Sequence, residues 1–169
     1  MSEQEAYIQE QLGLAAKMRS ELHDKAGRKG VTFIKDPTVR EQDSLRAEWE
    51  FAKVCGLMPD LRENVSGDGG ADFTVDVRYT VDVKASRNPG NLLIPVGKVT
   101  ADIYVLYDTD ESWPMPCPIG WMWGARMKKQ PSKDFGYGVE SHYMPAKQLM
   151  PFPSLIKMLR RHKNLGGQE

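Results

Sequence analysis

The alternation of hydrophobic and polar positions is clearest in residues 67–86, GDGGADFTVDVRYTVDVKAS. After a glycine-rich turn, two segments place valines and aromatic residues between polar ones, and Arg78 and Tyr79 separate them. Side chains alternate between the two faces of a half-buried strand, so this stretch predicts a β-hairpin. Asp82 and Lys84 then share one face of the second strand.

The length of the hairpin turn decides whether Asp72 lies near Asp82. A plain two-residue turn would place the two carboxylates on opposite faces, because a one-residue slip in register turns every side chain over. A three-residue turn or a bulge brings them to one face. We therefore expect an odd-length connection or a bulge, which would gather two acids and Lys84.

Apolar residues at spacings of three and four predict helices near both ends of the chain. The first follows a capping box, SEQE, and ends at Gly27 and Gly30. The second begins at Thr38, which has Glu41 three residues later, and closes at Gly56. A last helix is expected over residues 153–163.

The strands that follow the hairpin differ in character. Residues 103–107, IYVLY, form a continuous apolar run typical of a central buried strand. Residues 119–127 predict another strand with Trp121 and Trp123 on one face, and residues 128–141 predict a charged loop. The order of helices and strands indicates an α/β or α+β domain with a mixed sheet and flanking helices.

Two glutamates of the second helix have different surroundings. Glu50 has arginine and lysine neighbours three and four residues away and is expected in solvent. Glu48 has mostly apolar neighbours at these spacings, and a buried carboxylate is costly unless it is paired or binds a metal. Glu48 is therefore the stronger site candidate, and the alternative is a glutamate at the edge of the core that reaches water.

Composition narrows the class of protein. The 169 residues suit one domain, the formal charge is zero, and the two cysteines do not predict a disulfide framework. The chain has no apolar run long enough for a membrane span, and with only two cysteines a reducing, cytoplasmic setting is expected. It has no phosphate-binding loop, so no nucleotide cofactor is expected. Residues 41–82 carry ten acids and four bases, whereas residues 126–163 carry nine Lys and Arg and two acids. These are two solvated faces, or an acidic pocket beside a basic surface that suits a polyanion.

Glu48 in a helix, Asp72 opening a strand, and Asp82-Val83-Lys84 on the next strand resemble the E…D…(D/E)-x-K signature of the PD-(D/E)XK nucleases. This restriction-endonuclease-like group includes Holliday junction resolvases and many phage and repair nucleases. The resemblance covers residues 43–107, and an alanine stands where the family motif has a proline before Asp72. It implies a nuclease domain over residues 31–163, after an N-terminal helix within residues 1–30 and before a disordered tail at 164–169.

The resemblance also implies a function, that of a DNA endonuclease dependent on Mg²⁺ or Mn²⁺ in a prokaryotic cytoplasm, or a host cytoplasm if phage-encoded. Asp72 and Asp82 would ligate the metal with the Val83 carbonyl, and Glu48 would join directly or through water. Lys84 would orient the attacking water and stabilise the charge of the transition state. Candidate DNA contacts are Ser86, Lys98, Lys128, Lys129, Lys133, Arg160 and Arg161.

Other functions stay open from the sequence. The same fold could serve as a nucleic-acid-binding or protein-interaction module that does not cleave, as an exonuclease, or as a nuclease for RNA or flaps. The N-terminal helix is a packing element, a basic arm or a dimer contact. A homodimer would favour paired cuts, whereas a monomer would suit nicking.

Overall fold

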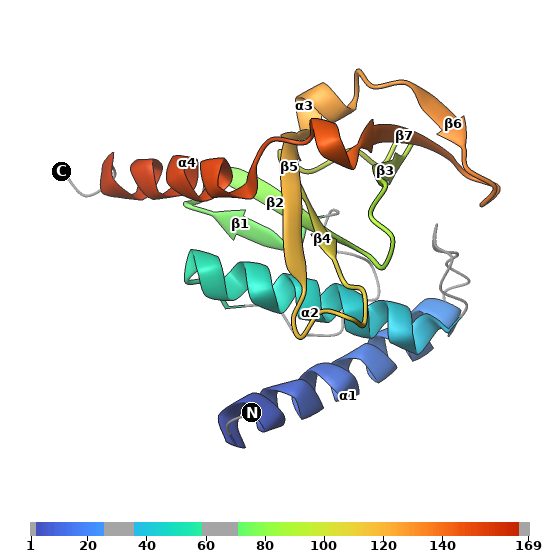
Figure 1. Cartoon of the computed structure of the whole chain (residues 1–169), viewed down its shortest axis with the longest axis vertical. Helices are drawn as coiled ribbons and strands as arrows, with labels where there is room; N and C mark the ends of the chain where they lie inside the picture. The colour runs from blue at the N-terminus through green and yellow to red at the C-terminus, as the bar shows by residue number, and fades with distance from the viewer. Residues whose placement is uncertain (1–2, 26–35, 59–70, 166–169) are drawn as a thin grey trace.

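Two sheets and the helices around them organise the chain in the computed structural model, which describes residues 3–25, 36–58 and 71–165 (Figure 1). Its elements are, in order, α1 (Glu3–Lys25), α2 (Pro37–Cys55), β1 (Phe73–Val75), β2 (Tyr79–Ser86), β3 (Asn91–Pro95), β4 (Ile103–Asp108), β5 (Cys117–Trp123), α3 (Gly124–Met127), β6 (Ser132–Asp134), β7 (Glu140–Pro145), the 3₁₀ turn η1 (Ala146–Gln148) and α4 (Phe152–Leu165). Helices and mixed sheets together define an α+β fold, which confirms the expected class.

The larger sheet has the strand order β1-β2-β4-β5, and the smaller has the order β3-β7-β6. Strands β2 and β4 run parallel, whereas the other pairs are antiparallel. Helices α2 and α4 pack on one face of the larger sheet, and strands of the smaller sheet pack on the other. Helix α1 lies against the outer side of α2 (Figure 1).

Strand β4 contributes alternate residues to two separate cores. Ile103, Val105 and Tyr107 pack on the side of α2 and α4. Tyr104 and Leu106 pack on the side of the smaller sheet. Because both faces of the strand are covered, its sequence is apolar throughout, as expected for a central strand.

Helix α2 begins one residue earlier than its sequence predicts. Asp36 is the N-cap, and its carboxylate accepts the backbone N–H of Thr38 at 2.9 Å. Pro37 takes the first helical position, where a missing N–H costs nothing. The capping box expected at Thr38 is therefore wrong. Gly56 closes the helix in the left-handed conformation, at φ 65°, as predicted.

The hairpin turn has the predicted odd length. Val75 pairs with Tyr79, which leaves the three residues Asp76, Val77 and Arg78 in the turn. The Arg78 N–H donates to the Val75 carbonyl at 3.1 Å, and Asp76 and Val77 have φ values of 53° and 56°. This is a three-residue hairpin loop, one residue longer than the common two-residue turn. Tyr79 belongs to β2 rather than to the turn.

Two expectations beyond β4 are wrong. The strand expected to continue to Met127 ends at Trp123, because α3 begins at Gly124. The expected loop at residues 128–141 contains β6, a three-residue edge strand paired with β7. Its sequence, Ser-Lys-Asp, has no apolar alternation that would predict a strand. The rings of Trp121 and Trp123 do share a face, with centroids 5.3 Å apart.

The two ends of the chain are only partly described. Helix α4 continues to Leu165, so the first two residues expected in the tail are helical, and residues 166–169 lie outside the described residues. The predicted end of α1 at Gly27 and Gly30 also lies outside them. Among the helices that the structure describes, none is long and apolar enough to cross a membrane.

Candidate functional site

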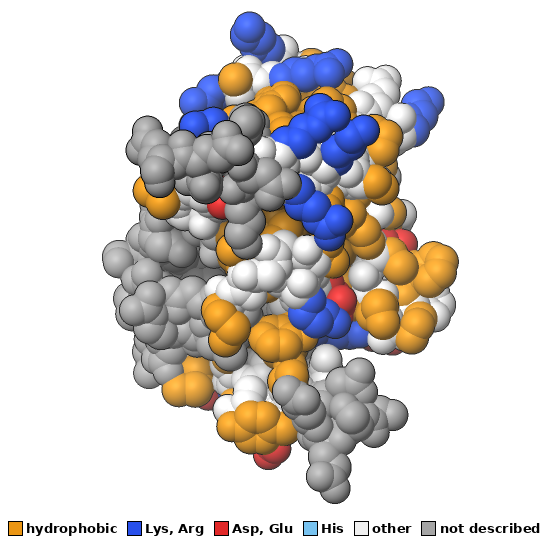
Figure 2. All heavy atoms as spheres, turned by 90° about the vertical axis from the view of Figure 1, so that its left-hand side faces the viewer, with side chains coloured by type: hydrophobic (Ala, Val, Ile, Leu, Met, Phe, Trp, Pro, Cys, Tyr) orange, Lys and Arg blue, Asp and Glu red, His pale blue; other side chains and the backbone are white. Residues whose placement is uncertain are grey.

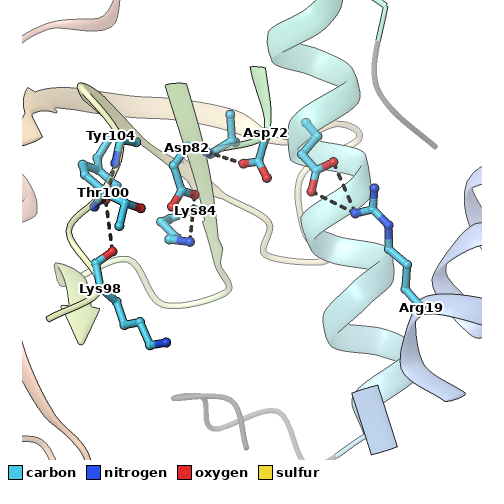
Figure 3. A network of polar contacts seen from close by, with 10 residues as sticks. Arg19, Asp72, Asp82, Lys84, Lys98, Thr100 and Tyr104 are labelled. Carbon is cyan, nitrogen blue, oxygen red and sulfur yellow. Dashed lines mark hydrogen bonds and ion pairs between the residues drawn. The ribbon is translucent and has the colours of Figure 1, made fainter. Parts of the chain in front are cut away.

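Asp72 lies beside β2 at the point where β1 begins. The paired register starts at Phe73 and Val81. The Asp72 N–H also donates to the Val81 carbonyl, at 2.9 Å, so the backbone leaves the register at Asp72. Its carboxylate accepts the Val83 N–H at 2.6 Å, so a side chain takes the place of a backbone partner just before β1 (Figure 3).

This hydrogen bond also locates the Val83 carbonyl. The N–H and C=O of a strand residue point to the same side, and residues two apart repeat the direction. The Val81 carbonyl faces β1, so the Val83 carbonyl faces the same edge, beyond the start of β1. An oxygen ligand is therefore aimed at the space beside Asp72.

Lys84 and Asp82 form an ion pair, with Nζ and Oδ1 2.7 Å apart. Val81 and Val83 face the core on the side of α2, so the alternate residues Asp82 and Lys84 face the smaller sheet. Asp82 is 6% exposed, whereas the Lys84 side chain is 40% exposed. Burial lowers the pKa of Lys84, but the Asp82 and Asp72 carboxylates outweigh it and raise this pKa overall. The lysine is a stable cation with access to solvent.

Glu48 is buried, 6% exposed, and bound by an arginine from α1. Nη1 of Arg19 lies 3.4 Å from Oε1 and 3.5 Å from Oε2 of Glu48 (Figure 3). Burial raises the pKa of Glu48 to about 7, Arg19 opposes that rise, and Asp82 and Glu41 add to it. The inward orientation of Glu48 is confirmed, and the alternative of a carboxylate reaching water is wrong. Glu50 pairs with Lys53 at 2.8 Å, as its neighbours predicted, but its side chain is only 16% exposed, so the expectation that it lies in solvent is wrong.

Neighbouring carboxylates raise the pKa values of Glu48 and Asp72. Burial raises the pKa of Asp72 well above its usual value, and Glu48 and Asp82 raise it further. Lys84 and the hydrogen bond from Val83 act against this rise. Acids crowded in this way would be relieved by a cation, and perturbed acids of this kind gather at functional sites.

The carboxylates do not form a complete set of metal ligands. Within residues 3–25, 36–58 and 71–165, no group of three or more His, Cys, Asp or Glu side chains lies close enough together to hold a metal ion. The Asp72 carboxylate is bound to the Val83 N–H next to Asp82, whereas Glu48 is bound by Arg19. The oxygen-rich part of the site is thus the aspartate pair and the edge beside Val83.

Two of the seven residues expected to contact DNA lie on the side of the aspartates. Ser86 follows Lys84 by two positions and shares its face of β2. The exposed Lys98 accepts a hydrogen bond at its carbonyl from the Tyr104 hydroxyl at 3.4 Å. Tyr104 is the β4 partner of Asp82, which brings Lys98 to the same side (Figure 3).

The other five expected contacts lie elsewhere. Lys128 and Lys129 line a separate pocket, where strands β2 and β4 begin and β5 ends. Lys133 lies on the edge strand β6. Arg160 and Arg161 are exposed on α4, and the charge of Arg160 acts on Cys55 at the end of α2. Cys55 is seven residues beyond Glu48, about 10 Å along the helix.

Arg19 is the site residue that the sequence interpretation missed. Leu12 and Ala16 are buried against α2, and Arg19 follows them at helical spacing on the inward side. A charged residue on the buried side of a helix needs a partner of opposite charge. The position of Arg19 on the same side as Leu12 and Ala16 is the sequence signal that could have identified it. No family model, curated protein or solved structure matches this chain. The function is therefore argued from the chemistry of these side chains.

Proposed function

We propose that this protein is a divalent-metal-dependent DNA endonuclease that hydrolyses phosphodiester bonds on a restriction-endonuclease-like core. The observation that carries the proposal is the Asp72 carboxylate bound to the Val83 N–H, directly next to Asp82, whose carboxylate contacts Lys84. The charges of Glu48 and Asp82 both act on Asp72, and that of Asp82 also acts on Glu48. These are the residue types, in the chain order, of the nuclease signature that the sequence resembles.

The donor atoms suit Mg²⁺ or Mn²⁺. These hard cations prefer carboxylate and carbonyl oxygens and keep several waters. Asp72, Asp82 and the Val83 carbonyl supply such oxygens, and Glu48 would join them directly or through water once Arg19 releases it. A bound ion would neutralise charge on the phosphate and lower the pKa of a water nucleophile.

The chain's own residues would perform the remaining tasks. The Val83 N–H fixes the orientation of the Asp72 carboxylate through its 2.6 Å hydrogen bond. Lys84 supplies a cation that would orient the attacking water and stabilise the growing charge of the phosphorane. Ser86 and Lys98, on the same side of the sheet, would contact neighbouring phosphates.

A non-cleaving module for nucleic acid or protein is the second candidate, and one observation favours it. Arg19 contacts both carboxylate oxygens of Glu48, which places a cation where the nuclease needs a free ligand. A protein that uses this arrangement only to stabilise its fold would bind DNA through its basic surface and leave it intact.

The test incubates the protein with labelled single-stranded, duplex, flap and four-way-junction DNA, and with closed circular DNA, in Mg²⁺, Mn²⁺ or EDTA. Two charge-removing variants, Asp82→Asn and Lys84→Gln, are compared with matched controls on exposed positions, Asp76→Asn and Lys147→Gln. We expect metal-dependent cleavage that falls by about 100-fold to 1000-fold in the site variants. The controls should stay within about twofold, because surface charges away from a site contribute little.

Each other outcome rejects part of the proposal. Binding to every DNA without cleavage in either metal would establish the non-cleaving module. Cleavage of linear DNA only, with closed circles intact, would establish an exonuclease. Cleavage that persists in both Asp82→Asn and Lys84→Gln would show that these residues are not the active site.

A further inference from the structure

A second concave site lies where β2 and β4 begin and β5 ends. It is a pocket of about 370 Å³, lined by Tyr79, Thr100, Ala101, Asp102, Trp123, Gly124, Ala125, Lys128 and Lys129. This volume is within the range of sites that hold small ligands. None of its residues belongs to the aspartate cluster, which consists of Asp72, Asp82, Lys84 and Glu48. The chemistry of the pocket therefore needs a separate explanation.

Two aromatic rings form the apolar part of the pocket. Tyr79 and Trp123 meet edge to face, with ring centroids 5.6 Å apart and planes at 61°. Both side chains are half-buried, so each still presents apolar surface to the pocket. Partly exposed aromatic rings on a sheet are the usual platform for an unstacked base.

One carboxylate in the pocket is held firmly in place. Oδ2 of Asp102 accepts the Thr80 N–H at 2.9 Å and the Thr80 hydroxyl at 2.8 Å. The Asp102 N–H donates back to the Thr80 hydroxyl at 2.9 Å. Both bonds to the carboxylate use the same oxygen, so Oδ1 is positioned to accept from a ligand. Amino groups on base edges are donors of that kind.

Two exposed lysines supply the positive charge. Lys128 and Lys129 follow α3 directly, and the charge of Lys128 acts on Asp102. They belong to the basic part of the chain, residues 126–163, which holds nine Lys and Arg against two acids. Figure 2 shows Lys and Arg side chains gathered over the upper part of one face, with hydrophobic side chains between them.

We propose that this pocket binds an unpaired nucleotide of a DNA strand. The base packs on Tyr79 and Trp123 and donates an amino hydrogen to Asp102, and its phosphate lies beside Lys128 and Lys129. A duplex keeps its bases stacked and offers no single base to a pocket, so the ligand is a single-stranded segment. The two neighbouring cations, Lys128 and Lys129, suit the consecutive phosphates of a strand better than a free nucleotide.

This inference deepens the proposed function and rests on it for the identity of the substrate. Tyr79 and Lys84 are five residues apart on β2, a separation of about 16 Å along the strand, and their side chains face opposite sides of the sheet. A strand that reaches both must pass around the edge of the sheet, so it spans at least about five stacked nucleotides. A DNA with a single-stranded segment beside a duplex could therefore occupy the pocket and the aspartate cluster together.

The test measures binding in EDTA, so that it does not depend on cleavage. Fluorescence anisotropy follows a labelled single-stranded oligonucleotide and a blunt duplex of equal length. The pocket variants are the double substitution Lys128→Gln and Lys129→Gln, and separately Ala125→Glu, which adds a negative charge to an exposed lining position. The control is the double substitution Lys147→Gln and Lys157→Gln, which removes the same charge from exposed sites outside the pocket.

We expect both pocket variants to weaken binding of the single strand by about tenfold, the loss that follows from one stacked base and its phosphate. Duplex binding should change by about twofold or less, and the control should lower both affinities equally. Trp123→Ala should give the same selective loss, and Ala125→Glu keeps the test valid if removal of the Trp123 ring unfolds the protein.

Several results would overturn the inference. Equal losses for single strand and duplex, or no loss in Ala125→Glu, would mean that the pocket does not hold a base. Displacement of the oligonucleotide by equal concentrations of deoxynucleoside monophosphates would assign the pocket to a free nucleotide. Selective single-strand binding by a protein that never cleaves would reject the nuclease but keep the pocket. Cleavage by the protein, together with unchanged DNA binding in the pocket variants, would keep the nuclease and reject the pocket as a nucleotide site.

Discussion

Asp72 and Asp102 lie on opposite edges of β2, one before β1 and the other before β4, and make similar hydrogen bonds to β2, yet their charges behave in opposite ways. Each carboxylate accepts a backbone N–H through Oδ2, from Val83 in one case and from Thr80 in the other. The pKa of Asp72 is raised well above its usual value, whereas the pKa of Asp102 is lowered.

The difference comes from what surrounds each hydrogen bond. Asp72 is half-buried and shares its site with Glu48 and Asp82, so burial and repulsion exceed the stabilisation by Val83. Asp102 is exposed, and the two hydrogen bonds from Thr80 dominate, with a smaller contribution from Lys128. A hydrogen bond to a carboxylate therefore does not determine its charge state. The first region accumulates negative charge at a cost in stability, and the second holds one stable carboxylate beside cations.

The largest expected effect on stability comes from Gly124, which lines the pocket beside Tyr79 and Trp123. A Cβ at this position would collide with the carbonyl oxygen of Ala101, and the Gly124 N–H already donates to the Asp102 carbonyl at 2.7 Å. Gly124→Ala should lower the free energy of unfolding by about 4 kcal/mol, because backbone on both sides must shift. Urea denaturation measures the loss. Gly90→Ala is the control, since its Cβ meets nothing within 4 Å. Similar stability of the two variants would mean that the pocket wall is not tightly packed.

The next effect is a gain in stability on acidification, and it belongs to the aspartate cluster. The pKa of Glu48 is raised to about 7, above its usual value of 4.5, so its contribution to stability is complete below pH 4.5 and lost as the pH rises through 7. Asp72 acts in the same direction. The free energy of unfolding should rise by about 2–3 kcal/mol between pH 8 and pH 5.

Glu48→Gln is the control for that pH dependence. The amide keeps the size of the side chain and removes the titration, so the variant should be more stable than the original protein at pH 8 and similar to it at pH 5. Urea denaturation at each pH gives both curves. A stability that is flat or falls between pH 8 and pH 5 would contradict the charge crowding around Asp72.

A smaller effect is expected from the arginine that the sequence interpretation missed. Arg19→Met removes the cation beside Glu48 and keeps the aliphatic part of the side chain. The loss should be about 2 kcal/mol at pH 8, where Glu48 would be ionised in part and buried without its partner, and it should shrink at pH 5. Arg19→Lys, which keeps the charge, should lose less. An equal loss at both pH values would show that Arg19 acts through packing alone.

The sequence predicted the hairpin well because its information is local. Period-two alternation and the spacing of Asp72 and Asp82 required an odd-length turn, and β1 and β2 have one. The inward position of Glu48 likewise followed from its neighbours on the same helix. Its contact with Arg19 joins positions 29 residues apart, and no local period encodes such a pair. The pocket at Trp123 was missed for the same reason, since three separate segments build it.

The smallest expected effect tests the hydrogen bonds that lower the pKa of Asp102. Thr80→Val removes the hydroxyl that donates to Oδ2 and accepts the Asp102 N–H, and it leaves the Thr80 N–H in place. The loss of stability at neutral pH should be about 1 kcal/mol. Thr74→Val, at the exposed position paired with Thr80, is the matched control and should change stability by about 0.5 kcal/mol or less.

The pH dependence of this variant is opposite in sign to that of Glu48. A lowered pKa gives stability that is present above the usual value of 3.8 and is lost as the pH falls through the folded pKa of Asp102. The difference in the free energy of unfolding between Thr80→Val and the original protein should therefore shrink as the pH falls below 3.8. The gain in stability from Glu48 and Asp72 is expected at higher pH, between pH 8 and pH 5. If Thr80→Val also weakens single-strand binding but not duplex binding, the carboxylate that Thr80 holds is part of base recognition. If both affinities stay unchanged, Asp102 stabilises the strands and does not contact the base.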